Sequence, residues 1–219
     1  MKLRNKSGLI AAIAGLAAVS MFSVGFAAWV LSATDEATVG GSISVDTVDE
    51  SGVYTFEAAP AFDDASIVFG TPTAAQISAY GLPASPAPWL TVTGSVNEKL
   101  TATLSIKVKN VASLADAKAH IVIGSLTETT GKYADALSDN LVAALPAPTA
   151  NDLTWNDSTS SAELVITFAW GSAFNGENPY KYYNSMANTP ANAADAAEKL
   201  TALEDLQGAA YTLQISTVA

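Results

Sequence analysis

Two stretches of strict alternation constrain the fold of this chain most. In residues 100–108 every second side chain is apolar and those between are mostly threonine, serine or lysine; residues 162–170 repeat the pattern and end at Trp170. A period of two is typical of a strand with one face in a core and one in water, as in antiparallel sheets. We expect further strands at residues 42–48, 53–56, 67–69, 119–126 and 211–218.

About eight strands separated by loops favour a mainly β fold, an antiparallel β-sandwich or jelly roll with inserted helices. We expect residues 119–126 to pair with residues 100–108. Residues 132–144 have helical spacing, and Thr189-Pro190 suits the start of another helix that would end near Gly208. Four prolines between Gly70 and Trp89 place that stretch outside the sheets or at an edge.

The composition excludes several classes of function. The 219 residues contain no cysteine and one histidine, which removes thiol catalysis, cysteine-bound zinc and iron–sulfur clusters. Apolar residues make up 49% of the chain and charged ones 14%, so the chain has enough apolar content to fold. The net charge of −11 repels nucleic acid phosphates and anionic lipids, so we expect no nucleic acid partner.

The N-terminus has the pattern of an export signal. Lys2, Arg4 and Lys6 form a basic start, residues 8–26 are apolar, and Gly25 and Ala27 stand at positions −3 and −1 if cleavage precedes Ala28. The alternative is a retained membrane anchor, because the apolar run extends through residues 29–31. We predict a signal peptide at 1–27, an arm at 28–41 and one β-sandwich domain at 42–219 of a secreted or cell-surface protein.

The residues after the cleavage point resemble a known family. Ala28-Trp29, then Asp35-Glu36-Ala37-Thr38, then Gly41-Ser42-Ile43-Ser44-Val45 are similar to the start of the TasA/camelysin group of secreted fibre proteins. The likeness covers residues 1–48, with Val30-Leu31 where that group has a polar pair. It implies a SipW-type signal peptidase, a jelly-roll body and polymers in which one subunit's N-terminal strand completes its neighbour's sheet, as in a biofilm matrix or pilus-like fibre.

The arm itself has features of a strand that adds to another sheet. It carries Trp29, Val30, Leu31 and Val39 among small polar residues, and these four are the predicted subunit contacts. Gly40 and Gly41 are the predicted hinge. Self-association into a homopolymer is therefore the expected partnership, with a membrane involved only during export or through an uncleaved anchor. The alternatives are an arm that packs on its own domain or that frays.

A second candidate contact surface is an aromatic loop. Residues 170–184 interleave Trp170, Phe174, Tyr180, Tyr182 and Tyr183 with asparagine and glycine. Such rings can stack on sugars or bury against a protein, which gives the alternative function of a monomeric adhesin or carbohydrate-binding module. The structural alternative is that Trp170 and Phe174 close one end of the fold.

Candidates for chemistry are weak, and we expect no enzyme, no catalytic residue and no metal or cofactor. His120 stands in a predicted strand without a nucleophile motif, and adjacent acids such as Asp63-Asp64 are typical of solvated loops. A hydrolase that uses one carboxylate pair is the third alternative. Calcium at Asp63-Asp64, or at Asn151-Asp152 with Asn156-Asp157, is a further alternative, although neither has EF-hand spacing.

Overall fold

The computed structural model describes residues 40–49, 52–81, 97–187, 189–204, 206 and 208–219. These residues form two mostly antiparallel four-stranded sheets with several helices, and helix and strand take similar shares of the chain. The fold is therefore more mixed than the mainly β fold that we expected.

The first sheet contains both the first and the last strand of the described chain. Its order is β3 (Ser66–Val68), β1 (Gly40–Asp49), β8 (Ala210–Thr217) and β5 (Ile121–Glu128). β1 runs parallel to β8, with Ser42 opposite Ala210 and Asp49 opposite Ser216, whereas β3 and β5 are antiparallel to their neighbours. The parallel pair is a departure from the all-antiparallel sheet expected.

The second sheet holds the two alternating stretches of the sequence. Its order is β2 (Ala61–Phe62), β4 (Thr101–Ile106), β7 (Ser161–Thr167) and β6 (Thr154–Asn156), all antiparallel. Leu104 lies opposite Leu164, and both are fully buried. β4 thus pairs with β7, and the expected pairing of residues 100–108 with residues 119–126 is wrong, because β5 lies beside β8 in the other sheet.

The two sheets share one hydrophobic core. Leu213 of β8 and Leu104 of β4 belong to the same buried cluster, and the Phe168 ring, just after β7, lies 4.9 Å from the Tyr211 ring of β8. The sheets are also joined by hydrogen bonds at one margin, since Val68 and Lys99 exchange backbone bonds of 2.7 and 2.8 Å. β3 therefore connects the first sheet to the chain that leads into β4.

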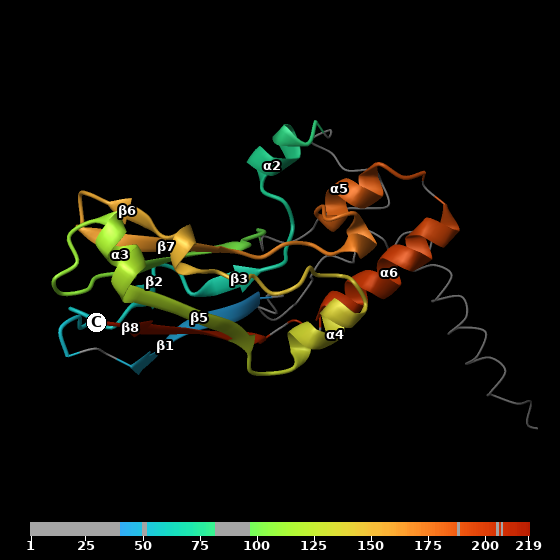
Figure 1. Ribbon diagram of the computed structural model, residues 1–219. Coiled ribbons are helices and arrows are strands. Elements are labelled where there is room, and N and C mark those ends of the chain that lie inside the picture. Colours follow the sequence, from blue (N-terminus) through green and yellow to red (C-terminus); the bar gives the residue numbers. More distant parts are fainter. Residues whose placement is uncertain (1–39, 50–51, 82–96, 188, 205, 207) are drawn as a thin grey trace, which may run out of the picture.

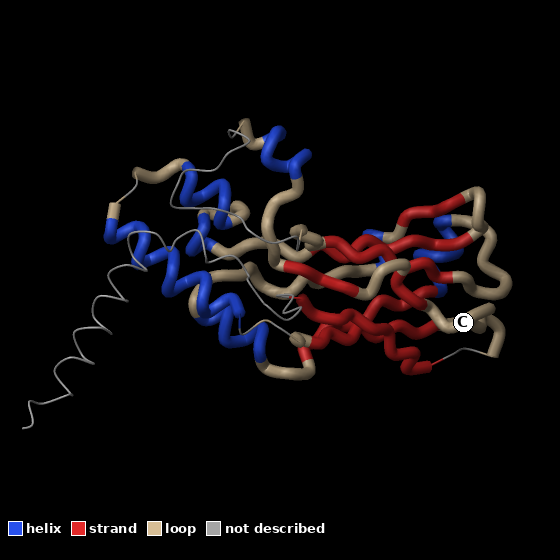
Figure 2. Tube along the Cα trace, turned by 180° about the vertical axis from the view of Figure 1, so that it is seen from behind, coloured by secondary structure: helices blue, strands red, loops and turns tan. Residues whose placement is uncertain are grey.

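The helices gather mainly at one end of the sheets, as Figures 1 and 2 both show. α4 (Lys132–Ser138), α5 (Pro179–Asn184) and α6 (Pro190–Glu204) form this helical end together with the short helix η3 (Ser172–Phe174). The others are α2 (Ala74–Ala79), α3 (Leu114–His120) and η2 (Ala150–Asp152). None of the helices in the described ranges is both long enough and apolar enough to cross a bilayer.

Local signals explain where these helices begin and end. The Thr189 hydroxyl accepts from the Asn192 N–H at 3.2 Å before Pro190 opens α6, and Gly208 has the left-handed φ of 72° that was expected there. The helix expected at 132–144 stops at Ser138, because Asn140 has a φ of 59°. The chain then pairs with the extension of β7, where Val142 lies opposite Trp170.

Candidate functional site

The sheet margins are the place where another chain could pair, so their state bears directly on assembly. β3 is bonded on both sides, to β1 and to Lys99. β2 and β6 are edge strands of only two and three residues. β5 is an edge strand of eight residues, and on its side away from β8 the described part of the chain supplies no strand partner. β5 is thus the longest sheet edge without a strand partner that the described chain presents.

The backbone of β5 offers groups to an incoming strand. The Val218 N–H donates to the His120 carbonyl, and the Thr129 N–H donates to the Ala210 carbonyl, both at 2.9 Å. In an antiparallel pair, the backbone N–H and C=O groups of successive residues point alternately toward the partner strand and away from it. Counted from these two bonds, the backbone groups of Ile123, Leu126 and Glu128 point away from β8. A register shift between Ile123 and Leu126 divides this edge into two short runs.

β1 forms a long ladder of backbone pairs with β8. Of the β1 side chains that the structure describes, Ile43 is buried and Val45 half-buried, while Ser42 and Ser44 are exposed. The strand nevertheless pairs along β8 from Ser42 to Asp49. Main-chain hydrogen bonds along this ladder therefore contribute to holding β1 in the sheet.

The predicted hinge lies inside this strand. Gly40 and Gly41 pair with Val68 and Ile67, so both glycines belong to the folded body, which we expected to begin at Ser42. A Cβ on Gly41 would lie 2.5 Å from the Ala209 carbonyl oxygen and 2.7 Å from the Tyr211 ring. Glycine is therefore required here by close packing, which is a different reason from the flexibility we had assigned to it.

The export signal and most of the arm lie outside the described residues. This applies to the cleavage residues Ala27 and Ala28 and to the predicted contacts Trp29, Val30, Leu31 and Val39. Their roles remain predictions.

The aromatic loop is mostly interior, which corrects its interpretation as a contact surface. Four of its five rings are buried, and the fifth, Tyr182, is half-buried; the buried four are Trp170, Phe174, Tyr180 and Tyr183. Phe174 lies 5.8 Å from Trp170 and 6.1 Å from Tyr183, edge to face in both cases. The rings fill the helical end, as the structural alternative had it, and are not free to stack on a sugar.

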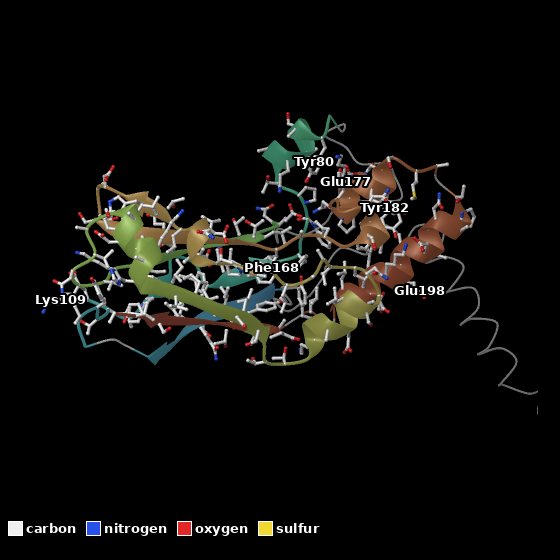
Figure 3. The ribbon with its side chains drawn as sticks, viewed as in Figure 1. Tyr80, Lys109, Phe168, Glu177, Tyr182 and Glu198 are labelled. Atoms are coloured by element: carbon white, nitrogen blue, oxygen red, sulfur yellow. The ribbon has the colours of Figure 1, made fainter. Side chains whose placement is uncertain are left out.

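The tyrosines of this end are also tied into polar contacts. The Tyr183 hydroxyl donates to the Asp195 carboxylate on α6 at 2.8 Å, and burial is the main cause that raises the pKa of Tyr183 above its usual range. In Figure 3 Tyr182 lies near α6 and Tyr80 lies near Glu177. Lys181 pairs with Glu177 and lies 5.3 Å from the centre of the Tyr80 ring.

One carboxylate that no sequence pattern singled out connects three separate parts of the chain. Glu98 accepts hydrogen bonds from the Trp170 indole N–H, from the Asn178 amide at 2.9 Å, and from the Gln76 amide at 2.5 Å. These donors come from the extension of β7, the N-cap of α5 and helix α2. α2 buries none of its residues, so this polar contact is a main tie between α2 and the body.

Replacing Glu98 with glutamine should destabilise the protein by about 2 kcal/mol or more, because the charged acceptor is lost and the new amide NH₂ group faces one or two of the three donors, depending on its orientation. Urea unfolding followed by tryptophan fluorescence measures this. Glu57→Gln is the matched control, since Glu57 forms only a half-exposed ion pair with Lys107 and its loss should change stability by less than about 1 kcal/mol. Equal effects of the two changes would contradict the bridging role of Glu98.

The remaining chemical candidates are engaged in local structure. Asp64 accepts from Ser66 and forms an ion pair with Lys99, whose hydrogen bond is the main cause that lowers the pKa of Asp64. Asp152 caps its own turn through Thr149, and the Asn156 side chain closes another turn with Ser158. Among the residues described, no three metal-ligating side chains come together. The calcium alternative gains no support from this geometry.

The lone histidine, His120, ends α3 and not a strand. Its ring stacks on Tyr54 with centroids 3.8 Å apart, and its Nδ1 lies 3.2 Å from the Val218 carbonyl oxygen. Through these contacts His120 links Tyr54, in the loop after β1, to Val218, just after the end of β8.

Comparison with protein families, curated proteins and solved structures gives no match for this chain.

Proposed function

We propose that this protein is a secreted, non-catalytic structural subunit that assembles into extracellular fibres, of the biofilm-matrix or pilus-like kind, by donating its N-terminal arm to a neighbour's sheet. In this proposal the two sheets are a β-sandwich of jelly-roll type. The observation that carries it is β5, an eight-residue edge strand without a strand partner among the described residues. An added strand would gain main-chain hydrogen bonds along such an edge.

The position of β1 supports donation of the segment upstream of it. The arm would leave the body at Gly40, where β1 begins at the helical end. Residues 28–39 reach about 40 Å when extended, which is enough to place several residues along a neighbouring edge. Repeated transfer to the next copy is a heterologous contact that does not close, so it generates a filament.

The adhesin alternative required an exposed aromatic surface in residues 170–184, which the structure does not show among these described residues. The rings that would have stacked on glycan are buried against one another, apart from the half-buried Tyr182. The hydrolase alternative has no carboxylate pair in the described chain that the structure singles out for catalysis. Assembly therefore remains the function that the geometry supports best.

Removal of residues 28–39 should abolish fibres and leave a folded monomer, because Gly40 and the rest of β1 are retained. Negative-stain microscopy and analytical ultracentrifugation of the exported protein, with and without these residues, measure the outcome. If both forms remain equally monomeric at high concentration, the proposal is wrong. Mass spectrometry of the exported chain checks that it begins at Ala28.

A matched pair of valines tests whether β5 is the acceptor. Val122 is 40% exposed on edge strand β5, and Val165 is 51% exposed on the inner strand β7. Val122→Glu should reduce fibre formation at least tenfold, since an arm that carries Asp35 and Glu36 would meet a like charge at the edge. Val165→Glu, with the same charge change, should assemble as the unchanged protein does. Equal assembly by both variants would exclude β5.

A further inference from the structure

A shallow pocket lies between α4 and α6 at the helical end. Its volume is about 280 Å³, and it is lined by Asp139, Leu141, Glu198, Lys199 and Ala202. Figure 3 places Glu198 on α6 in this part of the molecule. The proposed fibre contact at β5 makes no use of it.

The pocket combines free negative charge with an apolar floor. Asp139 and Glu198 have no side-chain hydrogen bond or ion pair within the described ranges, whereas the positive charge of Lys199 is balanced by Asp195 at 3.1 Å. Leu141, 1% exposed, and Ala202 supply apolar atoms beside them. Such a site suits a ligand with one cationic group next to an apolar one.

Processing would create a ligand of this kind within the chain. Cleavage before Ala28 produces an α-ammonium group next to Trp29, and residues 28–39 contain no lysine or arginine, so this ammonium would be the arm's one positive charge. An indole side chain is of a size to fit a pocket of this volume.

The pocket is also within reach of the arm. Gly41 contacts Ala209, which follows α6 by only a few residues, so the arm joins the body at the helical end that carries the pocket. A tether of twelve residues spans at most about 40 Å and gives the attached group an effective concentration in the millimolar range. A weak site is sufficient to hold the arm under these conditions.

We propose that, in the free subunit, the processed N-terminus docks in the α4–α6 pocket of its own chain, with the Ala28 ammonium between Asp139 and Glu198 and the Trp29 ring over Leu141 and Ala202. This inference depends on the proposed function, because it requires cleavage before Ala28. A docked arm is held away from a neighbour's β5 edge, so undocking becomes a step that precedes assembly.

The absence of cysteine allows a clean test. A nitroxide attached at Ser32→Cys in the mature protein, kept dilute and monomeric, should broaden the amide NMR signals of Leu141 and Ala202. The double variant Asp139→Asn with Glu198→Gln should remove most of that broadening. Asp135→Asn with Asp157→Asn makes the same charge change at exposed carboxylates outside the pocket and should leave the broadening intact.

Titration of the Ala28 amino group gives a second readout. Its pKa should lie above the usual value of about 8 in the unchanged protein and return to that value in the pocket variant, because two carboxylates favour the charged form.

Each alternative result is distinguishable. Contacts between copies are detected in a mixture of two kinds of subunit, one spin-labelled without ¹⁵N and the other ¹⁵N-enriched without a spin label. Broadening that occurs only in this mixture would overturn docking on the same chain. Broadening in neither sample would overturn the pocket as a site. Both measurements use monomers, so a failure to form fibres would refute the proposed function without deciding this one.

Discussion

Gly171→Ala should destabilise the protein by about 3 kcal/mol or more, through overpacking against backbone that cannot move aside. A Cβ at this position would lie 2.0 Å from the Asn140 carbonyl oxygen and 2.7 Å from the Val142 nitrogen. The Gly171 N–H donates to the Leu141 carbonyl at 2.9 Å, which holds these two backbone segments together. Denaturant unfolding followed by circular dichroism measures the change.

Gly52→Ala is the control, because no atom lies within 4 Å of a Cβ built there and its backbone is not left-handed. Its effect should be within about 0.5 kcal/mol of zero. A small effect of Gly171→Ala would mean that the segment after α4 does not pack against the extension of β7 as described.

Phe168→Ala should lower stability by about 3–5 kcal/mol, because the residue is 1% exposed and its removal leaves a cavity between the sheets. Its ring lies 4.9 Å from Tyr211, 6.0 Å from Tyr133 and 6.3 Å from Phe69, which come from the first sheet, from α4 and from the chain after β3. Figure 3 labels the residue between the two layers. We expect a lower thermal midpoint and a weaker near-ultraviolet signal from the tyrosines.

Val165→Ala is the control, because it shortens an exposed apolar side chain of β7, the strand that leads to Phe168. Val165 is 51% exposed, so its loss should change stability by less than about 0.5 kcal/mol. If Phe168→Ala costs as little as this control, the aromatic cluster does not join the two sheets.

The faces of single strands could be predicted from the sequence, but their partners could not. The alternation in residues 100–108 and 162–170 correctly identified Leu104, Ile106, Leu164 and Ile166 as buried. Periodicity describes one strand at a time, whereas pairing is decided by contacts between distant segments. The pairing of residues 119–126 was therefore assigned to the wrong sheet, and the parallel β1–β8 pair was not expected.

The candidate site was predictable only in part, for a related reason. The aromatic residues of 170–184 were recognised as distinctive, but composition alone does not separate rings that face solvent from rings that fill one end of a fold. Glu98 carried no signal at all, because its three donors come from residues 76, 170 and 178 and meet only in the folded chain. The N-terminal pattern remains a prediction, since it lies in residues 1–39.

The parallel pairing of β1 with β8 also determines how the protein responds to tension. A pull on the chain upstream of Gly40 acts along the axis of β1, and the strand is paired with β8 from Ser42 to Asp49. Those hydrogen bonds run across the direction of the pull, so they are loaded together in shear and do not open one after another. A subunit built in this way should resist stretching along the axis of β1.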